Sequence, residues 1–450
     1  PPQWAGLSGA QIGRLRIARK NKIRFQWQLD QYRAIAFSTY VGGTKNVSNV
    51  QSRFNMPKQP LKQGTLEASY ILGGGDPFAP TKEVTPGIIS AVPYDQSSKI
   101  TTSPTGRRRD LANWITQPNN SLSARVMVNR IWQEHFGKGI AGNANNFGAT
   151  GKKPTHPDLL DWLATQFIKQ QWSIKALHRI IMNSEAYRRS SQHPKAKTLA
   201  QKDPHSKLYA RFTERRLSAE ELRDSMLACS GELNPEMGGI PIRPDINLEA
   251  ALQPRLVMGT LAPSYQPNAK PEQRNRRTVY AKVIRGLRDP FMETFNQPSP
   301  NQSCEARNSS TVTPQVFSLF NSEESYDRSL AFAHHLLQQY QSRGDVINAA
   351  FYRVYGRPAR ASELKSCLDH WQTGEKKHLN LKIAVREIPI KIVQNAKEEN
   401  TGESFQYTEY LEIYQDYIPD LQAADVDIKT RALADICLAL FNSNEFVYIY

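Results

Sequence analysis

Residues 122–136, LSARVMVNRIWQEHF, decide the fold class expected for this chain. Their apolar side chains recur three or four positions apart, at Val128, Ile131, Trp132 and Phe136. That spacing places them on one face of an α-helix. Gly137 and Gly139 follow, and glycine readily adopts the left-handed backbone found just after a helix. The stretch therefore predicts an amphipathic helix with one buried face.

Helix signals continue on the C-terminal side. His156-Pro157 and Ser173 each precede an apolar stripe, and Ser218 with Glu221 has the spacing of a capping box. We expect further helices from Thr313 and at 325–341, 346–355, 361–371 and 428–441, and a short strand at 276–284. The predicted fold is mainly α, a multi-helix body wrapped by an extended Gly/Pro-rich segment with a few short strands.

Composition changes divide the chain into four regions. Residues 1–40 read as a basic helical segment, and 41–104 as an extended, linker-like segment with short strands. We expect the main helical domain at 105–322, with a long loop at 231–271. A C-terminal helical region follows at 323–450, with an acidic and aromatic insertion at 383–425.

The formal charge of +16 is unevenly distributed. Residues 101–230 hold 21 Lys and Arg against 10 Asp and Glu, whereas residues 381–450 hold 6 against 12. Solvated helix faces and internal pairing explain such charges, and so does an acidic partner such as a polysaccharide. Nucleic acid is an unlikely partner, because no recognition motif or dense basic run is present.

Four cysteines and the ends of the chain bear on its compartment. The cysteines are too far apart for metal or redox pairs, and no CxxCH haem motif or HExxH zinc motif occurs. No metal site is predicted, and the cysteines are either free or disulfide-bonded. The chain starts at Pro1 without a leader, which suggests a processed or partial polypeptide, and it has no run apolar enough for a transmembrane segment.

Polar residues within apolar helices are the first candidates for a site. They are Asn129, Arg130, His135, His178 and Arg179. Burying such groups is costly unless they are paired, so they indicate either a structural ion network or a ligand or redox site. No nucleophile motif is present, so the catalytic residues, and whether the chain is an enzyme, stay undecided.

Three arginines around the capping-box helix form a second set of candidates. Arg215, Arg216 and Arg223 could hold a carboxylate or sulfate in a cleft, or could simply pair along the helix, as Glu220 and Arg223 do at i, i+3 spacing. Both interpretations stay open.

A series of motifs resembles a known family. They are Asn129-Arg130-Ile131-Trp132, Phe136-Gly137-Lys138-Gly139, His156-Pro157-Asp158-Leu159-Leu160, Tyr187-Arg188-Arg189-Ser190-Ser191 and Arg216-Leu217-Ser218-Ala219-Glu220. Together they resemble the planctomycete-specific PSD-type domain of unknown function. That resemblance implies an extracytoplasmic protein, secreted, periplasmic or in the envelope. It also implies a C-terminal module of cytochrome c-associated proteins.

Three functions follow as hypotheses. The first is a helical scaffold or partner module for a c-type cytochrome or redox assembly, with haem c in a partner or a missing N-terminal part and no cofactor in this chain. The second is an enzyme or binding protein for acidic polysaccharide. The third is a structural subunit of an envelope assembly.

Overall fold

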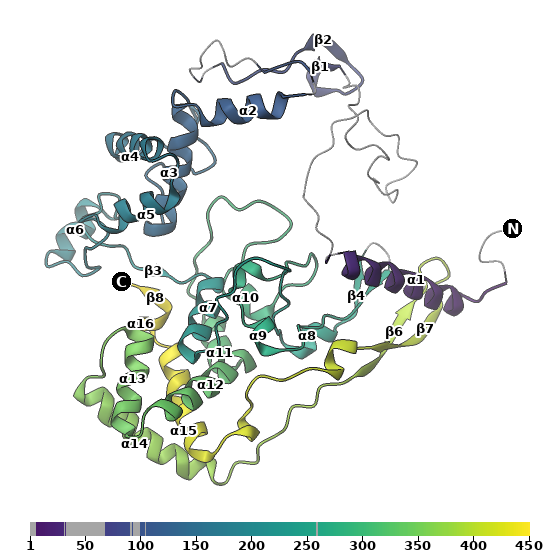
Figure 1. Ribbon diagram of the computed structural model, residues 1–450, viewed down its shortest axis with the longest axis vertical. Coiled ribbons are helices and arrows are strands. Elements are labelled where there is room, and N and C mark those ends of the chain that lie inside the picture. The colour runs from purple at the N-terminus through teal and green to yellow at the C-terminus, as the bar shows by residue number, and fades with distance from the viewer. Residues whose placement is uncertain are drawn as a thin grey trace. The chain divides into compact units, whose positions relative to one another are not determined.

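The computed structural model describes residues 6–30, 32, 68–90, 92, 100–103, 105–257 and 260–450. The chain divides into two compact units. Unit 1 comprises residues 1–34 and 214–450, and unit 2 comprises residues 35–213. Each unit has its own hydrophobic core. Helices predominate and the strands are few and short, which confirms the predicted fold class (Figure 1).

Unit 2 is built around three helices that pack on one another. They are α3 (Ser121–Phe136), α4 (Pro157–Lys169) and α5 (Ile174–Met182), with α2 (Arg107–Thr116) and α6 (Ala196–Lys202) beside them in sequence. Asn120 caps α3 and Ser173 caps α5, each by accepting a backbone N–H. Gly137 ends α3 with φ of 75°, as the glycine predicted. The apolar stripe of α3 lies in this core.

The Gly/Pro-rich segment before α2 contains one described hairpin. Its strands β1 (Ser69–Leu72) and β2 (Pro80–Val84) are antiparallel, exposed, and joined through the 3-10 turn η1 (Gly73–Gly75). Short strands were predicted here. Residues 41–67, 91, 93–99 and 104 of this segment lie outside the described residues, as do residues 1–5, 31 and 33–40 of the predicted N-terminal segment.

The core of unit 1 is a bundle of long helices. In it, α12 (Glu323–Gln339) packs on α15 (Ile428–Phe441) and α7 (Ala219–Ser230), while α14 (Ala361–His378) packs on α15 and α13 (Arg343–Tyr355). Shorter helices complete it: α8 (Leu248–Leu252), α9 (Pro271–Arg274), α10 (Pro290–Thr294), α11 (Thr313–Asn321) and α16 (Asn444–Val447). The capping box of Ser218 and Glu221 forms as predicted.

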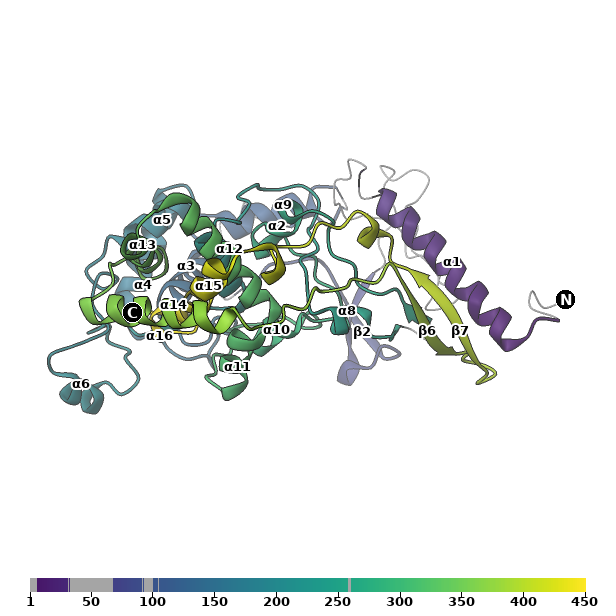
Figure 2. The same ribbon diagram turned by 90° about the horizontal axis from the view of Figure 1, so that it is seen from below.

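Strands in unit 1 occur as antiparallel pairs. They are β3 (Arg215–Arg216) with β8 (Tyr448–Ile449), β4 (Arg255–Val257) with β5 (Thr260–Ala262), and β6 (Lys391–Lys397) with β7 (Ser404–Tyr410). The β6–β7 hairpin and the 3-10 turns η3 (Glu412–Gln415) and η4 (Ala423–Asp425) occupy the acidic, aromatic insertion. The N-terminal helix α1 (Gly9–Asp30) lies along this hairpin, as Figure 2 shows.

The prediction of a strand at 276–284 was wrong. This segment instead contains the 3-10 turn η2 (Thr278–Tyr280), with isolated bridges from Arg276 to Asn234 and from Ala281 to Ile242. Side-chain hydrogen bonds, rather than pairing with a neighbouring strand, fix this segment. Asp224 accepts from both the backbone N and the hydroxyl of Thr278, at 2.8 and 2.6 Å. Segment 231–271, expected to be a loop, contains α8 and the β4–β5 hairpin.

All four cysteines are free thiols. Cys229 and Cys437 are buried in the core of unit 1, as small apolar side chains are, whereas Cys304 is exposed. Across the described ranges, no helix combines the length and the apolar character that a membrane crossing requires.

Candidate functional site

Helices α3 and α5 bring two of the predicted site residues into contact in unit 2. His135 Nε2 lies 2.8 Å from His178 Nδ1, so one imidazole donates a hydrogen bond to the other. The edge of Tyr187 closes over His135, with ring centroids 5.3 Å apart. Both histidines are half-buried. The pair can pass a proton between its rings.

Asn129, the neighbouring candidate, has a structural task. Its side chain is fully buried, donating to the backbone O of Ala141 at 3.0 Å and accepting from the backbone N at 2.8 Å. This clamp closes the loop after α3. A Cβ at Gly139 would lie 2.6 Å from the Asn129 amide, so the clamp also explains that glycine. Arg130 and Arg179 point outward, and Arg130 binds Asn145 at 2.6 Å.

In unit 1, Arg215 and Arg216 are bound by other protein groups. Arg215 makes a bidentate ion pair with Glu221, at 2.8 and 2.9 Å. Arg216 donates to Gln315 and, at 2.8 Å, to the backbone O of Ser310. Both guanidinium groups, which the sequence offered either as a fork for an anion or as local pairing partners, thus contact groups of the protein itself.

Arg223 is the predicted candidate that leads to a larger site. Its side chain is 4% exposed and donates to the backbone oxygens of Arg274 and Arg276 at 3.0 and 3.1 Å. Its Nε lies 3.4 Å from Glu324 Oε1. Glu220, its expected helix partner, pairs with Arg307 instead.

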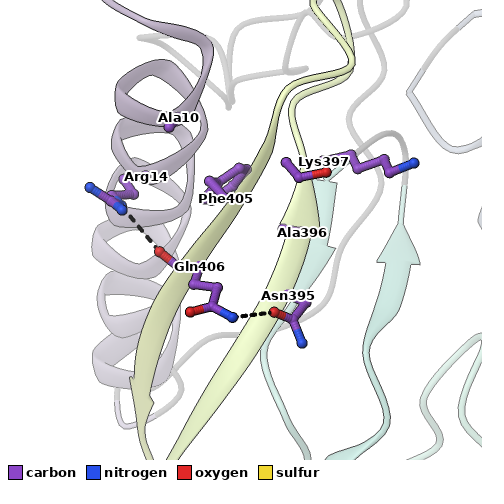
Figure 3. A pocket seen from close by; sticks show the side chains of 8 residues that line it. Ala10, Arg14, Asn395, Ala396, Lys397, Phe405 and Gln406 are labelled. Atoms are coloured by element: carbon purple, nitrogen blue, oxygen red, sulfur yellow. Dashed lines mark hydrogen bonds between the residues drawn. The ribbon is translucent and has the colours of Figure 1, made fainter.

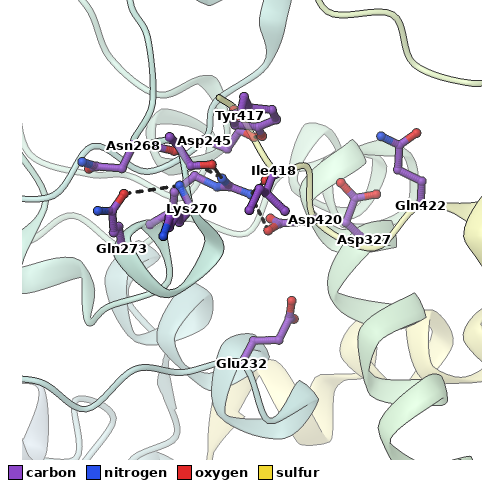
Figure 4. Close-up of polar contacts among 12 residues, drawn as sticks. Glu232, Asp245, Asn268, Lys270, Gln273, Asp327, Tyr417, Ile418, Asp420 and Gln422 are labelled. Atoms are coloured by element: carbon purple, nitrogen blue, oxygen red, sulfur yellow. Dashed lines mark hydrogen bonds and ion pairs between the residues drawn. The ribbon is translucent and has the colours of Figure 1, made fainter. Parts of the chain in front are cut away.

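Around Arg223 and Glu324 lies a group of charged side chains that we call the ionic cluster. It comprises Arg223, Glu232, Asp245, Arg274, Asp289, Glu324, Asp327, Arg328, Arg386 and Asp420. Figure 4 shows Glu232, Asp327 and Asp420 reaching it from three parts of unit 1. In this cluster six carboxyl groups face four guanidinium groups. Burial in this low-dielectric interior raises the pKa of five of these carboxyl groups: Glu232, Asp245, Asp289, Glu324 and Asp327.

Two arginines hold one side of the cluster as a tight ionic unit. Asp420 lies between Arg274, at 2.7 Å, and Arg328, and Arg328 also reaches Glu232 at 2.7 Å. Arg274 is completely buried and also donates to the backbone oxygens of Asn268, Ala269 and Ile418. Although burial opposes it, these two cations lower the pKa of Asp420. Asp420 is therefore a structural anion.

The opposite side of the cluster has too few cations. Burial, together with the charge of Asp289, raises the pKa of Glu324 to about 8. Burial likewise raises the pKa of Asp289 to about 6, although its carboxylate accepts from the backbone N of Phe291 at 2.9 Å. Burial raises the pKa of Asp245 despite its hydrogen bond from Tyr417.

This arrangement supports proton transfer near neutral pH. Burial therefore favours the protonated form of both carboxyl groups, and more strongly that of Glu324. The Glu324 side chain keeps 21% of its surface exposed, so solvent reaches it. A protonated carboxyl beside an ionised one can serve as general acid and general base.

Most members of the cluster were missed at the sequence level. Asp327 and Arg328 lie in α12 between Tyr326 and Leu330, so the signal that singled out Asn129, a polar residue in an apolar helix, applies to them too. Asp245 and Asp420 had no such signal, because they come from irregular segments.

The model of one protein family matches this chain. The model of PSD1, described as a protein of unknown function (DUF1553), matches residues 107–371. The chain belongs to the PSD1 family. No curated protein and no solved structure is significantly similar to it.

The PSD1 match includes both histidines and Arg223, Asp289 and Glu324, but not α1 or the β6–β7 hairpin. Within the ranges that the structure describes, no three His, Cys, Asp or Glu side chains converge closely enough to hold a metal ion.

Proposed function

We propose that this PSD1 protein is an enzyme that acts on a polysaccharide through acid–base chemistry, with Glu324 and Asp289 as its proton-transfer pair. The observation that carries the proposal is the excess of carboxyl groups on one side of the ionic cluster. At Asp420, by contrast, two cations hold one buried carboxylate.

The choice of a polysaccharide as substrate rests on the chemistry of such a pair. Cleaving a glycosidic bond requires a carboxylic acid that stays protonated near neutral pH, together with a second carboxyl group that acts as base or nucleophile. The raised pKa of Glu324 suits the acid. The pKa of Asp289 is raised less than that of Glu324, which suits the ionised partner. An acidic polysaccharide is the substrate class that we favour, given the basic charge of the chain.

The test compares release of reducing ends from acidic and neutral polysaccharides by the wild type and by two isosteric variants. Glu324→Gln and Asp289→Asn remove proton transfer with little change in shape, and Glu272→Gln is the control because Glu272 is exposed on α9. We expect both cluster variants to lose about 100-fold or more in rate, with the control unchanged. Infrared detection of a protonated carboxyl at pH 7, lost in Glu324→Gln, is the independent measurement.

Two results would overturn this proposal. One is undiminished hydrolysis by both cluster variants, which would place the chemistry elsewhere. The other is a protein that cleaves no polysaccharide and has an ionised Glu324 at pH 7, which would leave the cluster a structural network.

A second proposal concerns a partner protein, and the outer face of α11 favours it. Gln315 and Leu319 face the core of unit 1, whereas Val316, Phe317 and Phe320 are 50, 59 and 45% exposed. Grouped apolar side chains of this size are typical of a protein-binding surface. From the family resemblance we propose an extracytoplasmic partner that carries haem c, such as a c-type cytochrome.

A pull-down from native envelope tests this second proposal. The wild type should recover a haem-bearing polypeptide, and the double variant Phe317→Asp/Phe320→Asp should not. Val283→Asp is the matched control, because Val283 is an exposed apolar residue elsewhere in unit 1. Recovery of copies of this chain alone would favour a structural subunit of an envelope assembly instead.

A further inference from the structure

The N-terminal helix α1 is fixed on the β6–β7 hairpin by a close approach of backbone and side chain. A Cβ at Gly13 would lie 2.4 Å from the ring of Phe405, and one at Gly9 would lie 2.4 Å from Thr401 Oγ1. Only glycine at these positions lets the helix come so near. The face of α1 that meets the hairpin is therefore a glycine face.

An ion pair holds the same contact from another direction. Arg16 Nη1 lies 2.6 Å from Glu398 Oε1, and the Glu398 side chain is only 1% exposed. The other oxygen of Glu398 accepts from the backbone N of Asn400 and of Thr401, at 2.9 and 2.8 Å. This ion pair thus joins helix and hairpin, although 382 residues separate Arg16 from Glu398.

A groove of about 660 Å³ lies between this helix and the hairpin (Figure 3). Its volume falls within the range of about 300–1,000 Å³ typical of ligand sites. Arg14 reaches it from α1, whereas the Lys397 side chain extends away from Arg14 (Figure 3). The amides of Asn395 and Gln406, which bond to each other at 2.8 Å, supply donors and acceptors. Sugar hydroxyls need both kinds of group.

The two cations of the groove are available to a ligand. Arg14 donates its Nε to the backbone O of Gln406 at 3.2 Å, which orients the guanidinium and leaves four of its five N–H groups. Among the residues that the structure describes, Lys397 makes no ion pair. The rest of α1 adds to the positive field, because it holds five Lys and Arg against one Asp.

We propose that the groove between α1 and the β6–β7 hairpin binds the carboxylate or sulfate groups of an acidic polysaccharide. A guanidinium group beside a hydrogen-bonded pair of amides matches a chain that carries both acidic groups and hydroxyls. Single-stranded nucleic acid fits less well, because its bases need exposed aromatic rings to stack on. Phe405, the aromatic residue of the groove, is buried beneath Gly13.

This site lies outside the residues matched by the PSD1 model and is separate from the ionic cluster. Its binding does not depend on the acid–base chemistry proposed above. Glu324→Gln should therefore bind acidic polysaccharide like the wild type even when it no longer cleaves it, and the two proposals can fail independently.

The experiment measures binding of polygalacturonate, which carries carboxylates, and of chondroitin sulfate, with dextran as the uncharged control and an oligonucleotide as the alternative polyanion. Arg14→Ala/Lys397→Ala should weaken binding of the acidic polysaccharides about tenfold or more. Lys376→Ala/Lys377→Ala removes the same charge from exposed positions on α14 and should stay within about twofold.

A third variant separates the groove from its charge. Gly13→Leu keeps every cation but drives a side chain into Phe405, so it should lose binding while α1, which gains helix propensity, stays helical. The proposal is overturned if Gly13→Leu and Arg14→Ala/Lys397→Ala both bind acidic polysaccharide like the wild type. It is also overturned if the α14 variant loses as much binding affinity as the groove variant. Tighter binding of the oligonucleotide than of either acidic polysaccharide, through Arg14 and Lys397, would overturn it as well.

Discussion

Replacing Asn129 by alanine tests the clamp that closes the loop after α3. The substitution removes both hydrogen bonds to Ala141, at 3.0 and 2.8 Å, and leaves the N–H and C=O of a residue that is 3% exposed without these partners. Each buried backbone group left unpaired costs about 1–3 kcal/mol. Because the vacated space can admit a water molecule, we expect a loss near the lower end, about 2–4 kcal/mol.

Two measurements check this prediction. Urea unfolding followed by tryptophan fluorescence gives the change in the free energy of unfolding, since Trp132 lies in the same core. Hydrogen exchange of the Ala141 amide should accelerate in the variant, which locates the effect. Asn129→Asp separates shape from bonding, because it keeps the size but presents an oxygen to the Ala141 carbonyl, and it should be at least as destabilising.

The matched control is Asn145→Ala, which removes an exposed hydrogen bond from Arg130 in the same loop and should cost about 1 kcal/mol or less. An Asn129→Ala protein within about 0.5 kcal/mol of the wild type, with unchanged exchange at Ala141, would refute the clamp.

Three further predictions concern unit 1. Folding raises the pKa of Glu324 from 4.5 to about 8, so its contribution to stability is complete below pH 4.5 and is lost as pH rises to 8. Over that pH range, the melting temperature of Glu324→Gln should therefore fall less than that of the wild type. The opposite sign holds for Glu363, because hydrogen bonding to Arg357 lowers its pKa to about 2. The stability that this ion pair contributes is present above pH 4.5 and is lost as pH falls toward 2. In an acid titration, Arg357→Ala should not show that loss of stability. Trp371→Phe removes a 3.0 Å bond from the fully buried indole to the backbone O of Lys429 and should lower the free energy of urea unfolding by about 1–3 kcal/mol; an unchanged value would show that water replaces the bond.

Much of the fold was predictable because its signals are local. Helix α15 begins and ends where the sequence predicted, at Ile428 and Phe441, and the capping box of Ser218 forms. A repeat of three or four residues and a capping side chain both act within one turn of helix, so neither needs a distant partner. The prediction of a strand at 276–284 fails because that segment depends on distant partners: Asp224 and Arg223, both in α7, hydrogen-bond to it.

The sequence by itself determined a mainly helical chain, its capped helices, and polar residues that need partners. Only the tertiary structure decided which partners those residues have: His178 for His135, a backbone amide for Asn129, and Glu324 for Arg223. The groove beside α1 likewise depends on Gly13 meeting Phe405. The reason is physical, since burial and charge balance are set by groups far apart in sequence, whereas helix propensity and capping are set by neighbours.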